Sequence, residues 1–305
     1  MEFKQFSKII YERVSEFYGE SVKAQIEEVE KNNGVKLTGL ILFNEQTNIS
    51  PAVYLDDYYK EYRRGRKVSD IVVEIIRIYN RIDNRAKIDM DFLKSYETVQ
   101  ERVCFKLVHF GRNEALLQEI PHIPYLDLAI VFYFAYESEA LGKGSVLIRN
   151  SHLTDWNVSV QELYRNAASN TKRLFPVKIM NIDELAADLT GEERTVETDC
   201  FSQIFPEKEA LPMYVLTNRS KQFGAAGILY QDQLKKMAEQ LKNNLFVLPS
   251  SIHEVILLPD HGENPCSLKF MVREVNETQV AEEEILSDSV YYYDRETDKV
   301  RILCD

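Results

Sequence analysis

The feature that most constrains the fold is one apolar run, LDLAIVFYFAYE, at positions 126–137. Its β-branched and aromatic residues are typical of strands, and the lack of alternation indicates a strand buried on both faces. The run is too short for a membrane-spanning helix, which needs about twenty apolar residues. In a chain of 305 residues, we therefore predict a central strand inside a large core, and no membrane association.

The N-terminal region has the pattern of a helix followed by a β-hairpin. The dipeptide Asn33-Gly34 predicts the hairpin turn, because both positions of such a turn favour positive φ. Apolar residues at helical spacing predict one buried helix face that ends before Gly19: Phe3, Phe6, Ile10, Val14 and Phe17.

The element pattern predicts an α+β or mixed α/β fold. The N-terminal helix and hairpin region is followed by a larger region in which predicted strands and helices form a mixed sheet. A polar, helix-poor segment at Asp83–Asp91 separates the two. We therefore predict two domains, residues 1–95 and residues 96–305.

The charge balance argues against a general nucleic-acid-binding protein. The chain has 37 Lys and Arg against 49 Asp and Glu, a formal net charge of −12, whereas nucleic-acid-binding domains are usually basic. One stretch, residues 60–87, is locally basic and leaves nucleic-acid binding open as the third-ranked function. Its ordinary interpretation is a solvated helix face.

The cysteines favour a reducing compartment. Their spacing in Cys104, Cys200, Cys266 and Cys304 matches no zinc or redox motif, and Cys104 lies in an apolar run typical of a core residue. The N-terminus lacks the pattern of a secretory signal peptide. We predict a reduced, cytoplasmic protein without a metal site or a cofactor.

Segments along most of the chain resemble one protein family. The C-terminal half contributes MYVLTN, FGAAGILY, LFVLPSSIHEVILLPD and MVREVNETQVAEEEILSDSVYYYD, and the N-terminal half contributes NNGVKLTGL and ISPAVYLDDYY. They are similar to an uncharacterised bacterial family, common in gut Firmicutes, that is known only as a domain of unknown function. The resemblance implies an intracellular α/β protein and transfers no catalytic residue, substrate or partner.

One short segment contains residue types that hydrolases use. Ser250, Ser251 and His253 supply two possible nucleophiles and a base, and Glu254 follows directly. The segment lacks the G-x-S-x-G turn that exposes a nucleophilic serine. The competing interpretation is a turn followed by a strand over His253–Leu258, in which His253 and Glu254 point to opposite faces and do not share a site.

A tyrosine- and arginine-rich segment is the preferred contact site. Tyr58, Tyr62, Arg63 and Arg66 combine aromatic rings with cations, as interface hot spots do. The competing interpretation is a helix that packs its tyrosines half inward. The best-supported function is a binding or interaction protein for an unknown protein partner, and this hypothesis predicts at least one substantially exposed tyrosine ring among Tyr58, Tyr59 and Tyr62.

Overall fold

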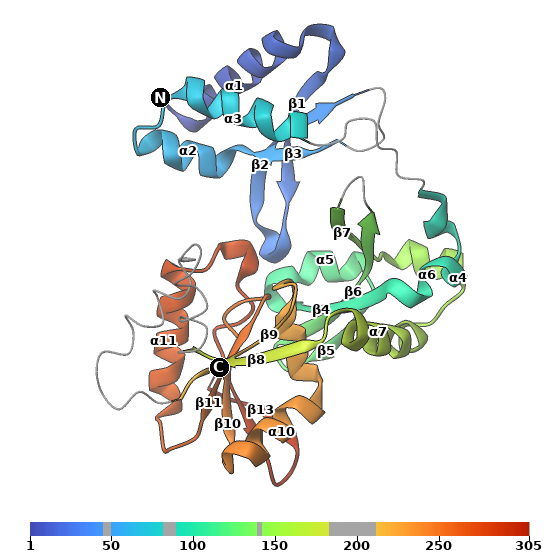
Figure 1. The fold of residues 1–305 in the computed structure, drawn as a ribbon, viewed down its shortest axis with the longest axis vertical. Coiled ribbons are helices and arrows are strands. Elements are labelled where there is room, and N and C mark those ends of the chain that lie inside the picture. The colour runs from blue at the N-terminus through green and yellow to red at the C-terminus, as the bar shows by residue number, and fades with distance from the viewer. Residues whose placement is uncertain (45–49, 82–89, 139–141, 183–211, 305) are drawn as a thin grey trace. The chain divides into compact units, whose positions relative to one another are not determined.

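The structure is a computed structural model that describes residues 1–44, 50–81, 90–138, 142–182 and 212–304 (Figure 1). Its internal contacts divide the chain into two compact units. Unit 1 is Met1–Lys94 with Ala135–Ser145, and unit 2 is Ser95–Phe134 with Val146–Asp305. The division into two domains at residue 95 stays a prediction about independent folding.

Unit 1 contains a three-stranded antiparallel sheet, in the order β1-β2-β3, and helices packed against it. Its elements are α1 (Phe3–Tyr18), η1 (Gly19–Ser21), β1 (Lys23–Glu30), η2 (Asn32–Gly34), β2 (Lys36–Phe43), β3 (Ala52–Tyr54), α2 (Leu55–Arg63), α3 (Val68–Arg81) and η3 (Met90–Lys94).

The predicted helix and hairpin of unit 1 are confirmed, with one exception on the helix face. Asn33 and Gly34 have φ of 62° and 68° and connect β1 to β2 in an antiparallel pair. Phe6, Ile10 and Val14 of α1 are fully buried. Phe17, in the last turn of α1, is 60% exposed instead. Its ring packs edge-on against Tyr18 and is not among the residues of the unit 1 core.

Unit 2 contains two further antiparallel sheets. Its helical elements are α4 (Tyr96–Val99), η4 (Gln100–Arg102), η5 (Gly111–Asn113), α5 (Glu114–Glu119), α6 (Asn150–Trp156), α7 (Val160–Leu174), η6 (Gly224–Leu229), α10 (Gln231–Leu241), α11 (Pro265–Thr278) and η7 (Glu282–Glu284). Its strands are β4 (Val103–His109), β5 (His122–Tyr125), β8 (Val177–Asn181), β9 (Tyr214–Asn218), β10 (Leu245–Leu248), β11 (Val255–Pro259), β12 (Val290–Asp294) and β13 (Lys299–Cys304). The strands β6 (Leu128–Ser138) and β7 (Gly142–Leu147) belong to unit 2 only in part, because Ala135–Ser145 is assigned to unit 1.

The apolar run becomes the central strand β6, as predicted. β6 lies between β4 and β5 and also pairs with β7, and its residues Leu128–Ala135 are buried. The larger sheet has the order β13-β12-β10-β11-β9-β8, and its neighbours pair antiparallel. Sheets of this kind with helices packed on them make an α+β fold, so the predicted fold class is confirmed.

None of the described helices combines the length and the apolar character needed to cross a membrane.

The start of η6 is packed so closely that only glycine fits. A Cβ atom on Gly224 would lie 2.5 Å from both the His253 carbonyl oxygen and the Thr217 Oγ. The Thr217 hydroxyl already donates a hydrogen bond of 2.9 Å to that carbonyl, so neither atom can move away freely. Gly224 therefore brings η6 against the loop that precedes β11.

We expect Gly224→Ala to lower the free energy of unfolding by about 1–3 kcal/mol, because the added methyl group overpacks this contact. Gly144→Ala is the matched control, since a Cβ there meets no atom within 4 Å. Chemical denaturation of both variants measures the difference. Equal stability of the two variants would contradict the close packing at η6.

Candidate functional site

The candidate hydrolase segment lies at one end of the six-stranded sheet. Pro249–Glu254 connects β10 to β11 and is hydrogen-bonded to the segment that leads into β12. Leu286 N–H donates to the Ser250 carbonyl and Ser287 N–H to the Pro249 carbonyl, both at 2.9 Å. Because β10 pairs with both β11 and β12, these two segments continue neighbouring strands.

His253 precedes strand β11, so the predicted strand start at His253 is wrong. Its backbone N–H donates to the Ser251 Oγ, and Ile252 N–H donates to the Glu284 carbonyl, which holds this part of the chain in a loop. The strand itself begins at Val255. These bonds outweigh the β propensity of the segment. The sequence shows the propensity but not the bond to Glu284, which is distant along the chain.

Both ring nitrogens of His253 have partners. Nδ1 accepts a hydrogen bond of 3.2 Å from the Phe223 N–H, and Nε2 lies 3.3 Å from the Glu284 carboxylate. The neutral ring therefore has its proton on Nε2. The ring also stacks on Phe223, with 5.8 Å between centroids. The hydrogen bond from His253 holds the pKa of Glu284 below its usual value.

The structure does not assemble the serine site that the residue types suggested. A serine nucleophile needs a base within hydrogen-bond reach, and the ring nitrogens of His253 bind Phe223 and Glu284. Ser250 is buried, and the Ser251 Oγ accepts from the His253 backbone, not from its ring. His253 is joined to Glu284 and to the η6 region, which makes it a packing residue.

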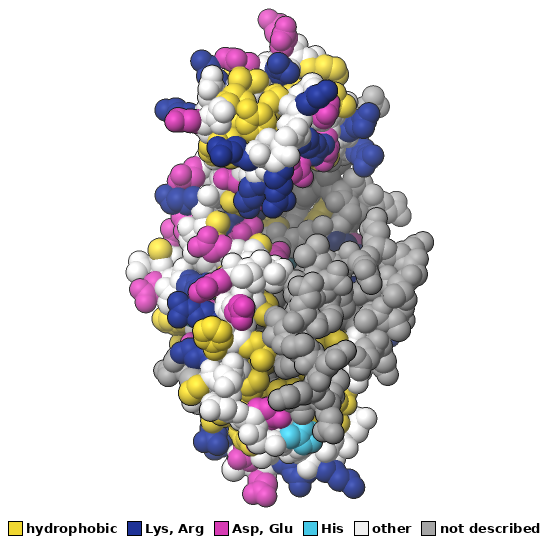
Figure 2. All heavy atoms as spheres, turned by 90° about the vertical axis from the view of Figure 1, so that its left-hand side faces the viewer, with side chains coloured by type: hydrophobic (Ala, Val, Ile, Leu, Met, Phe, Trp, Pro, Cys, Tyr) yellow, Lys and Arg dark blue, Asp and Glu magenta, His cyan; other side chains and the backbone are white. Residues whose placement is uncertain are grey.

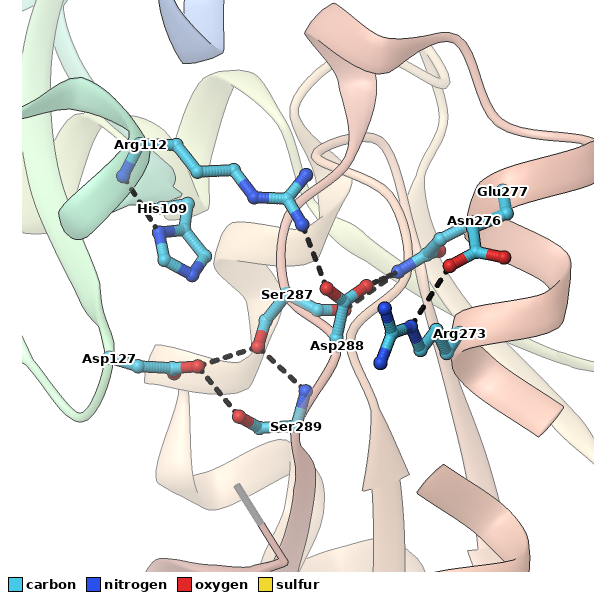
Figure 3. Close-up of polar contacts among 9 residues, drawn as sticks. All are labelled: His109, Arg112, Asp127, Arg273, Asn276, Glu277, Ser287, Asp288 and Ser289. Atoms are coloured by element: carbon cyan, nitrogen blue, oxygen red, sulfur yellow. Dashed lines mark hydrogen bonds and ion pairs between the residues drawn. The ribbon is translucent and has the colours of Figure 1, made fainter. Parts of the chain in front are cut away.

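A second polar cluster, drawn in Figure 3, has the Asp127 carboxylate at its centre. Asp127 follows Leu126, whose φ of 56° forms the turn between β5 and β6. The carboxylate accepts hydrogen bonds from the Ser287 hydroxyl at 2.6 Å, the Ser289 hydroxyl at 2.8 Å and the Tyr291 hydroxyl. Burial and the nearby Asp127 charge raise the pKa of Tyr291, which keeps it a donor.

The cluster continues from Asp288 to α11 and to the β4–α5 corner (Figure 3). The Asp288 carboxylate accepts from Arg112 Nη2 and from Asn276 Nδ2, each at 2.7 Å. Asn276 is 2% exposed and also donates to the Ser287 carbonyl, whereas its Oδ1 has no partner within the described chain. The carboxylates of the cluster are thus held by neighbouring donors.

His109 is part of the same cluster and is kept neutral by burial. Its Nδ1 accepts a hydrogen bond of 3.1 Å from the Arg112 N–H. Burial is the main cause that lowers the pKa of His109, and the positive charge of Arg112 lowers it further. The carboxylates of Asp127 and Asp288 raise this pKa but do not reverse the shift. In the sequence, Asp127 is one charged residue within the apolar run 126–137. The serines of SDS before VYYYD were the available signal for its partners.

The tyrosines of α2 face the core of unit 1, so the prediction of an exposed ring is wrong. Tyr58, Tyr59 and Tyr62 are half-buried and pack against that core. Tyr59 and Tyr62 stack on each other at 6.0 Å, and each lies 5.4 Å from the Phe6 ring. Burial, with the charge of Glu74, raises the pKa of Tyr58 to about 12. A helix beside a sheet buries a wide stripe, which includes these rings.

The cations near these tyrosines differ in their contacts. Arg66 binds both Glu61 and Glu74, which raises its pKa and makes it a link between α2 and α3. In the described part of the chain, Arg63 and Arg64 are exposed and have no ion-pair partner. Figure 2 shows hydrophobic side chains on the upper part of the view with Lys and Arg side chains below them.

The basic stretch is partly neutralised where the structure describes it. Arg66 has two carboxylate partners, and Lys60 forms an ion pair with Asp57 at 2.8 Å. Residues 82–87 of the stretch lie outside the described residues. This pairing leaves fewer free cations than the sequence count suggests.

The cysteines and possible metal ligands add no reactive site within the described residues. Cys104 is buried, as predicted for a core residue, and burial raises the pKa of its thiol to about 11. Cys266 is exposed, and Cys200 lies outside the described residues. Over the described ranges, no group of three or more His, Cys, Asp or Glu side chains is arranged to hold a metal ion.

We expect His253→Ala to lower the free energy of unfolding by about 1–3 kcal/mol, because it removes the contacts with Phe223 and Glu284. His261→Ala is the control, since His261 is exposed. Urea denaturation at pH 7.5 compares the two. A His253→Ala protein as stable as the control would contradict the packing role.

A second prediction concerns pH. Because burial lowers the folded-state pKa of His109, the unfolded chain binds a proton more readily below about pH 6.5. The wild-type protein should therefore lose stability as the pH falls from about 7 to about 5, and His109→Gln should lose less over the same range. Denaturation at several pH values, with His261→Gln as control, measures this. Identical pH slopes in all three proteins would refute it.

Comparison with known proteins places the chain in one family. No curated protein and no solved structure matches it. A family model described as "Family of unknown function (DUF5688)" matches residues 3–295, which is nearly the whole chain. The chain therefore belongs to this family of unknown function.

Proposed function

We propose that the protein is a binding or protein-interaction protein without chemistry of its own. One observation carries the proposal. Nine large hydrophobic side chains are exposed in the described structure, and seven of them belong to unit 1: Met1, Tyr11, Phe17, Ile26, Phe43, Val73 and Ile78. Single exposed apolar residues are ordinary, but their concentration in the smaller unit is typical of a contact surface.

The polar clusters of unit 2 support the same choice. A catalytic base needs a lone pair that can accept a proton from the nucleophile or the substrate, and a nucleophilic hydroxyl needs such a base within hydrogen-bond reach. The ring nitrogens of His253 and the carboxylate of Asp127 are instead used in bonds that join segments of the fold. This favours binding over the alternative of a hydrolase with His253 and Ser250 or Ser251.

The contact surface differs from the one expected from the sequence. Tyr58 donates to Glu74, Tyr62 packs against the core and Arg66 pairs with Glu61. We therefore propose that these three residues stabilise unit 1. Arg63 keeps an exposed cation and remains a proposed contact residue. Nucleic-acid binding ranks below, because the paired charges on α2 reduce the basic character of residues 60–87.

We also propose a cytoplasmic location in a bacterium. The buried thiol of Cys104, which forms no disulfide, supports a reducing compartment. The bacterial origin follows from the resemblance of the chain to its family. The segments LPSSIHEVILLP and VYYYD are the proposed family markers.

Photo-crosslinking in cells that express the full chain tests the proposed function. A benzoylphenylalanine replaces Tyr11, Phe17 or Val73 in unit 1, and Leu126 or Phe270 in unit 2 as matched exposed controls. At least one unit 1 position should give a discrete protein adduct, and the unit 2 positions should not. Adducts from unit 2 alone, or from no position, would contradict an interaction surface on unit 1.

A further inference from the structure

The outer edge of strand β1 has no neighbouring strand in the part of unit 1 that the structure describes. β1 pairs only with β2 and ends the order β1-β2-β3. It spans eight residues, and six of them are exposed, including Ile26 at 37%. Soluble proteins usually shorten or cover such edges, because their free N–H and C=O groups accept another strand.

The charges along β1 are unequal at its two ends. Lys23 begins the strand, and Glu27, Glu28 and Glu30 occupy its second half. Lys36 of β2 neutralises Glu28 at 2.8 Å, and the Glu27 carboxylate accepts from the Gln25 amide. Glu30 lies opposite Lys36 in the β1–β2 register, so this one lysine serves both Glu28 and Glu30. The second half of the edge is therefore acidic.

A cavity of about 630 Å³ lies where β1 begins and β2 ends. Tyr11 and Phe43 supply aromatic walls, and both are more than one-third exposed. Glu20, Lys23 and Ser15 supply polar groups, and the Ser15 Oγ has no hydrogen-bond partner among the described residues. The cavity can thus receive an apolar side chain together with a backbone donor.

We propose that β1 accepts an extended basic peptide of another protein as an added antiparallel strand, with one large apolar side chain of the peptide in the cavity. Backbone bonds along a sheet edge supply affinity, and a side-chain pocket supplies specificity. In the antiparallel direction the C-terminal end of the peptide reaches the cavity, and its basic residues lie along the acidic second half of β1, where Glu27 points to one face of the sheet and Glu28 and Glu30 point to the other. The proposal rests on the proposed function and names its partner class.

The same charges disfavour a second copy of the chain as the occupant. Two antiparallel β1 strands would bring Glu27, Glu28 and Glu30 of both copies onto one shared edge, with only Lys23 of each strand to offset them, and the chain has a net charge of −12. Like charges on neighbouring strands are destabilising. A basic peptide instead gains from every carboxylate that remains unpaired.

The experiment uses the full chain and three fluorescein-labelled hexapeptides with blocked C-termini: KVKVKF, the charge-reversed EVEVEF and the anchor-free KVKVKS. Fluorescence anisotropy should show binding of KVKVKF. EVEVEF should bind at least about tenfold more weakly, because it loses exposed charge pairs. KVKVKS should also bind at least about tenfold more weakly, because it loses one buried apolar side chain. Amide hydrogen exchange should slow at residues 23–30 when KVKVKF is added.

Variants of exposed residues assign the binding to β1. The double variant Glu27→Lys, Glu30→Lys should weaken KVKVKF binding about tenfold, whereas Glu16→Lys, an exposed change on α1, should not. Ser15→Leu should fill the cavity and remove the preference for KVKVKF over KVKVKS. Circular dichroism checks that each variant is folded.

Several outcomes would overturn the proposal. The first is that KVKVKF does not bind. The second is that the double variant and Glu16→Lys change binding equally. The third is that light scattering shows a dimer whose amount changes in the double variant, which would indicate pairing of two β1 strands. Crosslinking from Phe17 or Val73 with no KVKVKF binding would refute the peptide site and keep the interaction function. Binding of KVKVKF with no crosslinked partner would keep the peptide site and refute the interaction surface of the proposed function.

Discussion

The architecture of unit 2 depends on one carboxylate that serves two sheets. Asp127 lies in the turn between β5 and β6 of the smaller sheet, and its three hydroxyl donors lie on β12 of the larger sheet or just before it. Its backbone carbonyl also accepts from the Phe110 N–H at 2.9 Å. Hydrogen bonds to a charged group are stronger than neutral ones, and a lost partner leaves buried hydroxyls unsatisfied. These hydrogen bonds therefore fix the position of the β5–β6 turn against the start of β12.

Residues with reactive side chains gather at one end of the larger sheet, where hydrogen bonds join neighbouring segments. The loop before β11 and the segment before β12 are hydrogen-bonded to each other, and His253 joins the first to Glu284 and Phe223. Buried polar networks are stable only when their members are paired. The bonds of His253 and Asp127 join separate segments of the fold. The arrangement favours a structural role for this cluster.

Local sequence pattern predicted the elements whose signals are local. The hairpin at Asn33, the helix at Phe3–Tyr18 and the central strand β6 each depend on residues within one segment. The role of Asp127 could not be predicted, since its partners lie 160, 162 and 164 positions away. The start of β11 was misplaced because bonds to Ser251 and Glu284 compete with strand propensity. The α2 tyrosines combine apolar rings with polar hydroxyls, and only tertiary packing decided that they face Phe6.

The free edge of β1 has a physical consequence for unit 1. A free strand edge exposes backbone donors and acceptors that water satisfies only until another strand replaces it. Lys36 forms an ion pair with Glu28 and lies opposite Glu30 in the β1–β2 register, whereas Glu27 is bound by the Gln25 amide. β1 itself carries Glu27, Glu28 and Glu30 against Lys23 alone, so its edge keeps an excess of negative charge. A strand of opposite charge therefore gains more from this edge than a second acidic edge does.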